Sequence, residues 1–278
     1  MRPDVETNNA FVYCLAEAAQ RYDVKVILAQ MMSNHAHLMT DDPLGNDVQF
    51  REHFHKMFAK CQNAYRGRWE NLWASEEPCV VDVMDRDAVM DKLVYIATNP
   101  IKDGLVDRTH RWPGPKFVRA LLTQTPLKAR RPRHFFSKRG MMPAEVELEL
   151  CLPDSIDDKP AFLAELERRI EAVEEEHIRE RARTGRGVVG RRQILRTAWQ
   201  TSPTTKEPRR DLRPRVATRD KWLRIATLQR NKEWQIEYQE ARAKWLSGLP
   251  AEFPYGTYWL KRFANVSVRA APPPIEPN

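Results

Sequence analysis

The sequence predicts an α+β fold, in which a small antiparallel sheet packs against helices and is followed by a mostly helical C-terminal region. Up to about residue 106, short β-rich runs alternate with segments whose apolar residues recur at helical spacing. Beyond residue 140, two long charged segments with helical periodicity dominate. The 278 residues are enough for one large or two modest domains, each with a hydrophobic core.

Three helices are expected in the N-terminal half, at residues 9–22, 47–67 and 85–100. The first has Asn8 or Asn9 available as its N-cap. The second carries an apolar stripe on one face, made of Phe50, Phe54, Met57, Phe58 and Cys61. The third is expected to begin after Asp85, as an N-cap, and to stop at Pro100, because proline disrupts a helix interior.

Three strands are expected between these helices. Residues 24–32 and 35–40 are β-rich runs separated by the turn-prone pair Ser33 and Asn34, which predicts two adjacent antiparallel strands. Residues 79–84 predict a third strand of the same sheet. One sheet with helices packed on it follows from this order.

The composition changes after residue 106, which indicates a domain boundary. Residues 126–140 contain six Lys or Arg and no acidic residue, and we expect a basic linker there. The predicted domains are therefore 1–125, 126–140 as linker, and 141–278 as a mostly helical basic accessory domain. That last region is expected to hold a short strand and two long helices, with a core formed by Trp222, Trp234, Tyr238 and Trp245.

The overall charge favours a polyanionic partner. Lys and Arg total 46 against 38 Asp and Glu, a formal charge of +8, so nucleic acid is the first expectation. An apolar run of the roughly 20 residues needed to span a membrane is lacking, and the first residues do not read as a signal peptide. A cytoplasmic protein without membrane partners is expected. Its four cysteines show no C-x-x-C pair, so neither a zinc knuckle nor a disulfide framework is indicated.

His35 and His37 are candidate ligands of one metal ion. In a strand, side chains at i and i+2 point to the same face, so both imidazoles can reach one cation. His53 and His55 have the same spacing on a predicted helix, where i and i+2 lie about 200° apart and cannot share a ligand. Spacing alone is weak evidence, and strand histidines with ordinary hydrogen bonds remain an alternative.

Tyr95 and Asn99 lie one turn apart on the helix predicted at 85–100, so they share a face. A tyrosine is a poor nucleophile at its free pKa near 10 and needs a cation beside the scissile group. His35, His37 and the side-chain oxygen of Asn99 would hold a divalent ion with positions open for phosphate oxygens. The alternatives are a core aromatic for Tyr95 and a helix-end residue for Asn99.

Two motifs resemble a known family. "MMSNHAHLM" followed by "YIATNPIKDGLV" is similar to the REP-associated tyrosine transposases, HUH single-tyrosine enzymes related to the insertion-sequence-200 transposases. Between them, "AYRGRWENLWAS" resembles the family's Asn-x-Arg-x-Gly-x-x-Trp region at Arg66, Arg68 and Trp73. The resemblance covers about residues 8–115.

The resemblance implies a HUH or ferredoxin-like nuclease core and a metal-dependent endonuclease and strand transferase acting on single-stranded DNA. Tyr95 would form a 5′-phosphotyrosine link and release a 3′-OH. His35, His37 and Asn99 would hold Mg²⁺ or Mn²⁺. Hairpin-forming DNA repeats would be the substrate, and the protein would be a monomer or homodimer.

The sequence departs from the family pattern at two places. An expected first strand before the helix at 9–22 is absent or short, so the alternative is a catalytically impaired protein of the same fold that binds DNA hairpins. Ala36 is smaller than the usual residue between the two histidines. A further alternative is a metal-dependent phosphodiesterase using Asp82, Asp85 and Asp87, although Asp85 and Asp87 are better explained as helix-capping acids.

Basic stretches outside the predicted catalytic site are candidates for DNA contacts, or alternatively are solvated surface. "KARRPRHFF" interleaves arginines with aromatic residues, a pattern suited to phosphate contacts and base stacking. The arginines singled out are Arg66, Arg68, Arg130, Arg131, Arg133, Arg186, Arg191, Arg192, Arg209, Arg210, Arg213 and Arg215.

Overall fold

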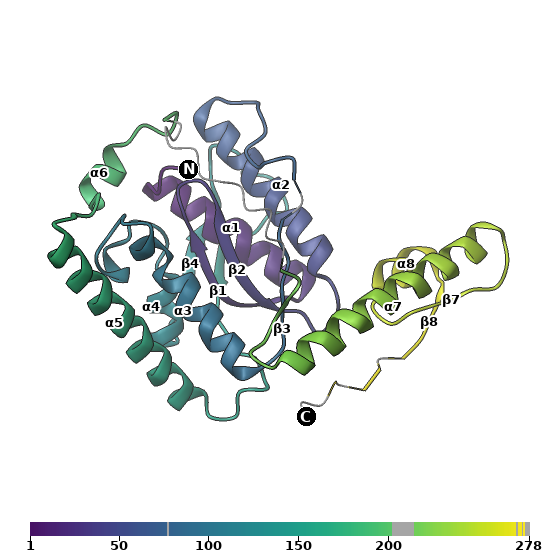
Figure 1. Ribbon diagram of the computed structural model, residues 1–278. Coiled ribbons are helices and arrows are strands. Elements are labelled where there is room, and N and C mark those ends of the chain that lie inside the picture. The colour runs from purple at the N-terminus through teal and green to yellow at the C-terminus, as the bar shows by residue number, and fades with distance from the viewer. Residues whose placement is uncertain (77, 202–213, 271, 274, 276–278) are drawn as a thin grey trace. The chain divides into compact units, whose positions relative to one another are not determined.

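A computed structural model describes residues 1–278 except 77, 202–213, 271, 274 and 276–278 (Figure 1). The chain divides into two compact units. Unit 1 comprises Met1–Pro43, Asp47–Glu76 and Met90–Arg209, and unit 2 comprises Leu44–Asn46, Glu77–Val89 and Arg210–Asn278. This division differs from the one expected from composition, and it places the segment expected to be a linker inside unit 1.

Helix α1 (Val5–Tyr22) lies at the centre of unit 1 and packs against α2, β1, β4 and β5. Phe11 of α1 makes edge-to-face contacts with Phe54 and Phe58 of α2 (Asp47–Arg66), at ring-centroid distances of 5.3 and 5.2 Å. The same ring meets Phe117 at 5.9 Å. All four rings are buried, so the predicted apolar stripe of α2 forms the core, with Met57 at its half-buried margin.

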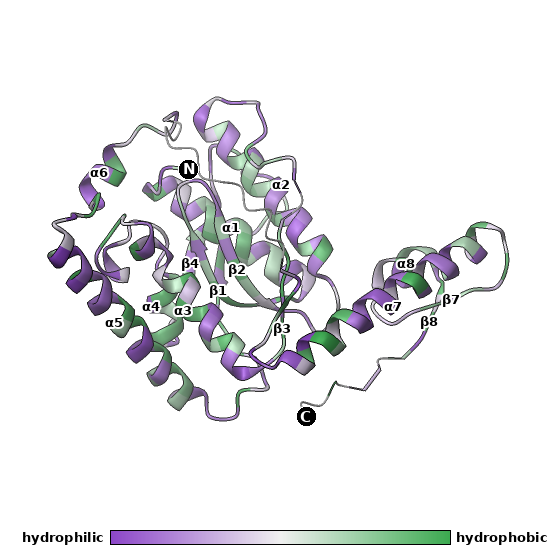
Figure 2. Ribbon diagram, in the orientation of Figure 1, coloured by the Kyte–Doolittle hydropathy of each residue, from purple (hydrophilic) through white to green (hydrophobic). Residues whose placement is uncertain are grey.

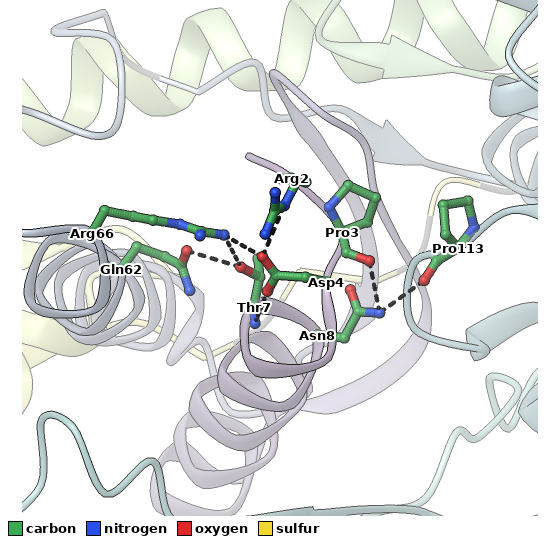
Figure 3. Close-up of polar contacts among 8 residues, drawn as sticks. All are labelled: Arg2, Pro3, Asp4, Thr7, Asn8, Gln62, Arg66 and Pro113. Carbon is green, nitrogen blue, oxygen red and sulfur yellow. Dashed lines mark hydrogen bonds and ion pairs between the residues drawn. The ribbon is translucent and has the colours of Figure 1, made fainter. Parts of the chain in front are cut away.

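The start of α1 differs from the prediction. Asp4, and not Asn8 or Asn9, is the N-cap, and its Oδ1 accepts a hydrogen bond of 2.9 Å from the backbone nitrogen of Thr7. Figure 3 shows Arg66 reaching the same carboxylate, at 2.5 Å. Asn8 instead donates to the carbonyl of Pro113 at 2.8 Å. The asparagines near the predicted start thus connect α1 to distant segments and do not cap it.

The predicted hairpin is confirmed. β1 (Lys25–Met31) pairs antiparallel with β2 (Ala36–Asp41), with Gln30 opposite His37. The turn is closed by a hydrogen bond of 2.9 Å from the Met32 nitrogen to the His35 carbonyl. The other edge of β1 receives one backbone hydrogen bond, from Cys151 to the Val26 carbonyl at 3.1 Å.

The predicted third strand does not join this sheet. β3 is only Asp82–Val83, and it pairs in parallel with β6 (Val216–Ala217) in unit 2. Among the described residues, β1 and β2 form a two-stranded sheet. The expectation of one three-stranded sheet was therefore wrong, because the partner of residues 79–84 lies more than a hundred positions further along the chain.

Helix α3 (Arg86–Lys102) begins where expected, with Asp85 accepting a 2.7 Å hydrogen bond from the nitrogen of Ala88. It continues through Pro100 for two more residues. Gly104, at φ +68°, follows the last turn, and its nitrogen donates to the Ile101 carbonyl at 2.9 Å. A left-handed glycine at this position is a common helix terminator, so Gly104 and not Pro100 ends the helix.

The rest of unit 1 consists of short elements and one long helix. After the 3₁₀ turn η1 (Thr109–Arg111) come α4 (Phe117–Thr123) and the antiparallel pair β4 (Leu127–Arg130) and β5 (Glu145–Leu148). α5 (Lys159–Thr184), predicted at 159–183, packs against α4 (Figure 1), and α6 (Arg191–Arg196) follows.

Unit 2 contains the second long helix, α7 (Lys221–Leu246), which is followed by β7 (Glu252–Phe253), α8 (Tyr258–Ala264) and β8 (Ser267–Val268). Hydrophilic and hydrophobic residues alternate along α7 (Figure 2). Trp234 and Tyr238 stack on each other at 5.2 Å, and Tyr238 meets buried Phe253. Trp222 is 64% exposed, so the predicted aromatic core is only partly formed. Within the described residues, the helices are too polar or too short to cross a membrane.

Candidate metal and nucleophile site

The β1–β2 hairpin places the two predicted histidines side by side. His35 ends the turn and His37 lies in β2, and their ring centroids are 4.8 Å apart in an edge-to-face arrangement. Nδ1 of His35 lies 2.8 Å from Oδ1 of Asn34. Because the asparagine oxygen only accepts, Nδ1 carries the proton, and Nε2 of a neutral His35 keeps its lone pair.

Helix α3 brings Tyr95 and Asn99 to this pair. The Tyr95 ring centroid lies 5.4 Å from that of His37, and the Asn99 Nδ2 atom lies 3.2 Å from Nε2 of His37. Tyr95 is 42% exposed, whereas Asn99 is buried. All four residues belong to unit 1. The four residues singled out from the sequence thus converge, and Tyr95 is not the core aromatic of the alternative interpretation.

His37 is held in its neutral form. Burial, followed by the charges of His35 and Lys92, lowers its pKa to about 4. Its Nε2 therefore accepts the hydrogen bond from Asn99, which matches an imidazole that is unprotonated on this nitrogen. A neutral imidazole is the form that binds metal ions, and because it has a single lone pair, Nε2 of His37 would bind a cation in place of the Asn99 hydrogen bond.

Asn99 supplies the observation that tests whether these residues fit a metal. Its Oδ1 is a buried oxygen with no hydrogen-bond partner. Burying an unsatisfied carbonyl costs about 1–3 kcal/mol, so a buried oxygen of this kind calls for an explanation. A cation beside His35 and His37 would provide one. The donor set of two imidazole nitrogens and one amide oxygen fits a divalent ion, with Mn²⁺ better suited than Mg²⁺ because Mg²⁺ favours oxygen ligands throughout.

The site differs from a conventional cluster of acidic and histidine ligands. In the described part of the chain, no group of three or more His, Cys, Asp or Glu side chains could hold a metal ion. The alternative phosphodiesterase trio is accordingly not assembled: Asp85 caps α3, and Asp87 lies 3.8 Å from Arg219. A metal at the hairpin would depend on Asn99 as its third protein ligand.

Two lysines next to Tyr95 were missed by the sequence reasoning. The Lys102 Nζ atom lies 4.9 Å from the centroid of the Tyr95 ring, and that of Lys92 lies 6.0 Å from it. Burial lowers the pKa of Lys102. The signal was present in the sequence, because positions i−3 and i+7 lie on the same helical face as residue i. Both cations are suitably placed to attract a phosphate approaching Tyr95.

His53 and His55, which have the same i, i+2 spacing as His35 and His37 but lie on helix α2, point to different neighbours, as helical spacing predicts. His53 turns toward α1 and bonds Oε2 of Glu17 at 2.7 Å, whereas His55 packs against Trp73 at a ring-centroid distance of 4.9 Å. The two imidazoles thus have different partners. Trp73, which the family resemblance singled out, is half-buried, and its Nε1 donates to the His55 carbonyl.

The arginines predicted to bind DNA differ in their surroundings. Arg66 and Arg131 have structural roles: Arg66 pairs with Asp4, and Arg131 donates to the Met142 carbonyl at 2.7 Å. Arg68 and Arg130 pair with Glu70 and Glu145 near the surface. Besides Arg130, the exposed members are Arg133, Arg186, Arg191, Arg192 and Arg215. Arg209, Arg210 and Arg213 lie outside the described residues.

Comparisons of the chain with protein-family models, with curated proteins and with solved structures found no match. The interpretation of the site therefore depends on the sequence motifs and on the local geometry.

Proposed function

We propose that the protein is a metal-dependent single-stranded DNA endonuclease and strand transferase, with Tyr95 as its nucleophile and hairpin-containing DNA as its substrate. The convergence of Tyr95 with His35, His37 and Asn99, from two segments about 60 positions apart, carries this proposal. The resemblance to the tyrosine transposases supplies the reaction class.

In the proposed reaction, Oη of Tyr95 loses its proton and bonds to the phosphorus of the scissile phosphodiester. The bond from phosphorus to the 3′-oxygen breaks, and that oxygen leaves protonated as a 3′-OH. A divalent ion held by His35, His37 and Asn99 would act as a Lewis acid toward the phosphate oxygens. Attack by a 3′-OH on the phosphotyrosine reverses these steps and joins two DNA ends.

The protein's own groups contribute orientation and charge. The ring of His37 flanks Tyr95 on one side, and the ammonium groups of Lys92 and Lys102 approach it as well. Positive charge beside a phosphate stabilises the negative charge that develops in the transition state. The half-exposed Tyr95 is open to a substrate from solvent, unlike Tyr13, whose hydroxyl is tied to the Pro143 carbonyl at 2.6 Å.

The test is a denaturing gel with labelled single strands that contain a hairpin, incubated with Mn²⁺. The proposal predicts a covalent protein–DNA band that Tyr95→Phe abolishes. The band should be unchanged in Tyr255→Phe, which alters a similarly exposed tyrosine of unit 2. DNA binding without a covalent band would favour the alternative, a binding protein of the same fold. Cleavage that persists in Tyr95→Phe would exclude tyrosine as the nucleophile.

A further inference from the structure

At the end of α2, guanidinium groups and aromatic rings alternate along the surface of unit 1. The Arg68 Cζ atom lies 5.4 Å from the centroid of the Trp199 ring, and that of Arg66 lies 5.9 Å from the same ring. Arg66 also lies 4.3 Å from the Tyr65 ring, which in turn is 5.1 Å from the ring of His134. We call these five residues the aromatic–arginine row. Tyr65, Arg68 and Trp199 are partly exposed and His134 is exposed, whereas Arg66 pairs with Asp4 and keeps only 11% of its side chain exposed.

Trp69 follows Arg68 of this row in the chain and is open to solvent. Its side chain is 91% exposed, the highest value among the large hydrophobic residues of unit 1 apart from Met141. The backbone around it is nevertheless held in place. Gly67, at φ +63°, ends α2 and lets the Arg68 nitrogen donate to the Asn63 carbonyl at 2.9 Å. The Asn63 side chain donates to the Glu70 carbonyl at 2.8 Å. The indole is thus presented to solvent from a fixed loop.

We propose that the aromatic–arginine row, together with Trp69, binds single-stranded DNA by stacking its unpaired bases and contacting its phosphates. The choice of ligand rests on the proposed function. The chemistry is favourable because aromatic rings and arginine planes both stack on bases, and guanidinium groups also bind phosphate. Exposed aromatic faces have no access to the paired and stacked bases of a duplex, so a single strand is preferred. The formal charge of +8 supports an anionic ligand.

The row lies near the turn that carries His35. The Ser33 carbonyl in that turn accepts a hydrogen bond from the nitrogen of Met1. Three residues along from Met1, Asp4 pairs with Arg66 of the row at 2.5 Å, so the first residues of the chain contact both the turn and the row. The row and the turn that carries His35 thus belong to the same unit and contact the same N-terminal segment.

The experiment measures binding of a fluorescein-labelled oligo(dT) strand by anisotropy, using the full chain with Tyr95→Phe so that binding is read without cleavage. Trp69→Ala and Trp199→Ala are each expected to weaken binding about tenfold, the range typical of losing one stacked base. Trp69→Phe, which keeps an aromatic face, should restore most of the affinity. Trp222→Ala removes a comparably exposed indole from α7 and should leave it unchanged. Binding of a blunt duplex should not respond to Trp69→Ala.

A second measurement locates the contact. Photocrosslinking with 5-iodouracil in the strand should yield DNA-linked peptides that contain Trp69 or Trp199. Unchanged binding in Trp69→Ala would overturn the inference, as would failure of the parent protein to bind oligo(dT). A loss of thermal stability in Trp199→Ala with full oligo(dT) affinity would also overturn it, because the row would then only fasten Trp199 to α2.

The covalent assay with Tyr95 intact separates this inference from the proposed function. If the adduct forms normally and Trp69→Ala leaves oligo(dT) binding unchanged, DNA binding by the aromatic–arginine row is refuted and the proposed function still holds. If Trp69→Ala weakens oligo(dT) binding but no adduct forms with Tyr95 intact, DNA binding by the row is supported and the proposed nuclease activity is contradicted.

Discussion

Replacing Asn99 by leucine tests the metal site through protein stability, without any need for DNA. The buried Oδ1 of Asn99 has no hydrogen-bond partner, and its amide nitrogen makes one hydrogen bond of 3.2 Å to His37. The unsatisfied oxygen costs about 1–3 kcal/mol, and the hydrogen bond returns about 1 kcal/mol. Because leucine has a similar shape and no polar atoms, Asn99→Leu should leave the metal-free protein equally stable or raise its free energy of unfolding by up to about 2 kcal/mol.

The two proteins should then diverge when Mn²⁺ is added. A ligand at about one hundred times its dissociation constant stabilises the folded state by about 2.7 kcal/mol, or roughly 5 to 10 °C in melting temperature for a unit of this size. The original protein should show this increment in thermal unfolding with Mn²⁺ against EDTA, and Asn99→Leu should lose most of it.

A matched pair of double variants supplies the control. His35→Ala with His37→Ala should abolish the Mn²⁺ increment. His53→Ala with His55→Ala, at identical spacing on α2, should lower the overall stability through loss of the Glu17 contact but keep the increment. The reasoning would be refuted if the original protein gained no stability from Mn²⁺, or if Asn99→Leu gained as much as the original.

Three further predictions concern the core of unit 1. Glu17 is 5% exposed; its burial is outweighed by hydrogen bonds from His53 and Arg21, which lower its pKa below the usual 4.5. The ionised carboxylate should therefore stabilise the fold above about pH 4.5, and this effect should disappear as the pH falls through the lower folded pKa. Near neutral pH, Glu17→Gln should lower the free energy of unfolding by about 3 kcal/mol. This difference should shrink between pH 5 and pH 3 in urea titrations. Asp4→Ala removes a helix cap and also removes the carboxylate that pairs with Arg66, whose side chain is only 11% exposed. Urea denaturation should show a free energy of unfolding lower by about 2–4 kcal/mol. A decrease below about 1 kcal/mol would contradict the network in Figure 3. Phe11→Ala should cost about 3–5 kcal/mol in the same assay because it empties the centre of three edge-to-face contacts, whereas Phe263→Ala, on the exposed part of α8, should cost less than about 0.5 kcal/mol.

Local patterns predicted the long helices and the hairpin well. The apolar stripe of α2 and the turn at Ser33 and Asn34 are encoded within a few residues of where they act, so periodicity and turn chemistry were sufficient. The convergence of His37 with Tyr95 and Asn99 was also expected, because strand alternation and helical spacing fix which side chains share a face.

Non-local pairings could not be predicted in the same way. β3 pairs with β6, and neither segment carries a signal that identifies the other. Asp4 was missed as a cap because Asn8 and Asn9 lie closer to the first apolar residues of α1. Pro100 was expected to end α3, but proline near the last turn removes only one hydrogen bond, and the left-handed Gly104 completes the termination. The exposure of Trp222 shows that aromatic residues at helical spacing do not by themselves define a core.

The central claim, that Tyr95 is a nucleophile toward single-stranded DNA, is tested most directly by mapping the covalent product. After incubation with hairpin DNA and Mn²⁺, digestion with nuclease and trypsin should yield the peptide spanning residues 93–102 with a nucleotide phosphate on Tyr95, identified by tandem mass spectrometry. Adducts on another tyrosine, or quantitative DNA cleavage with the 93–102 peptide unmodified throughout the reaction, would contradict the account.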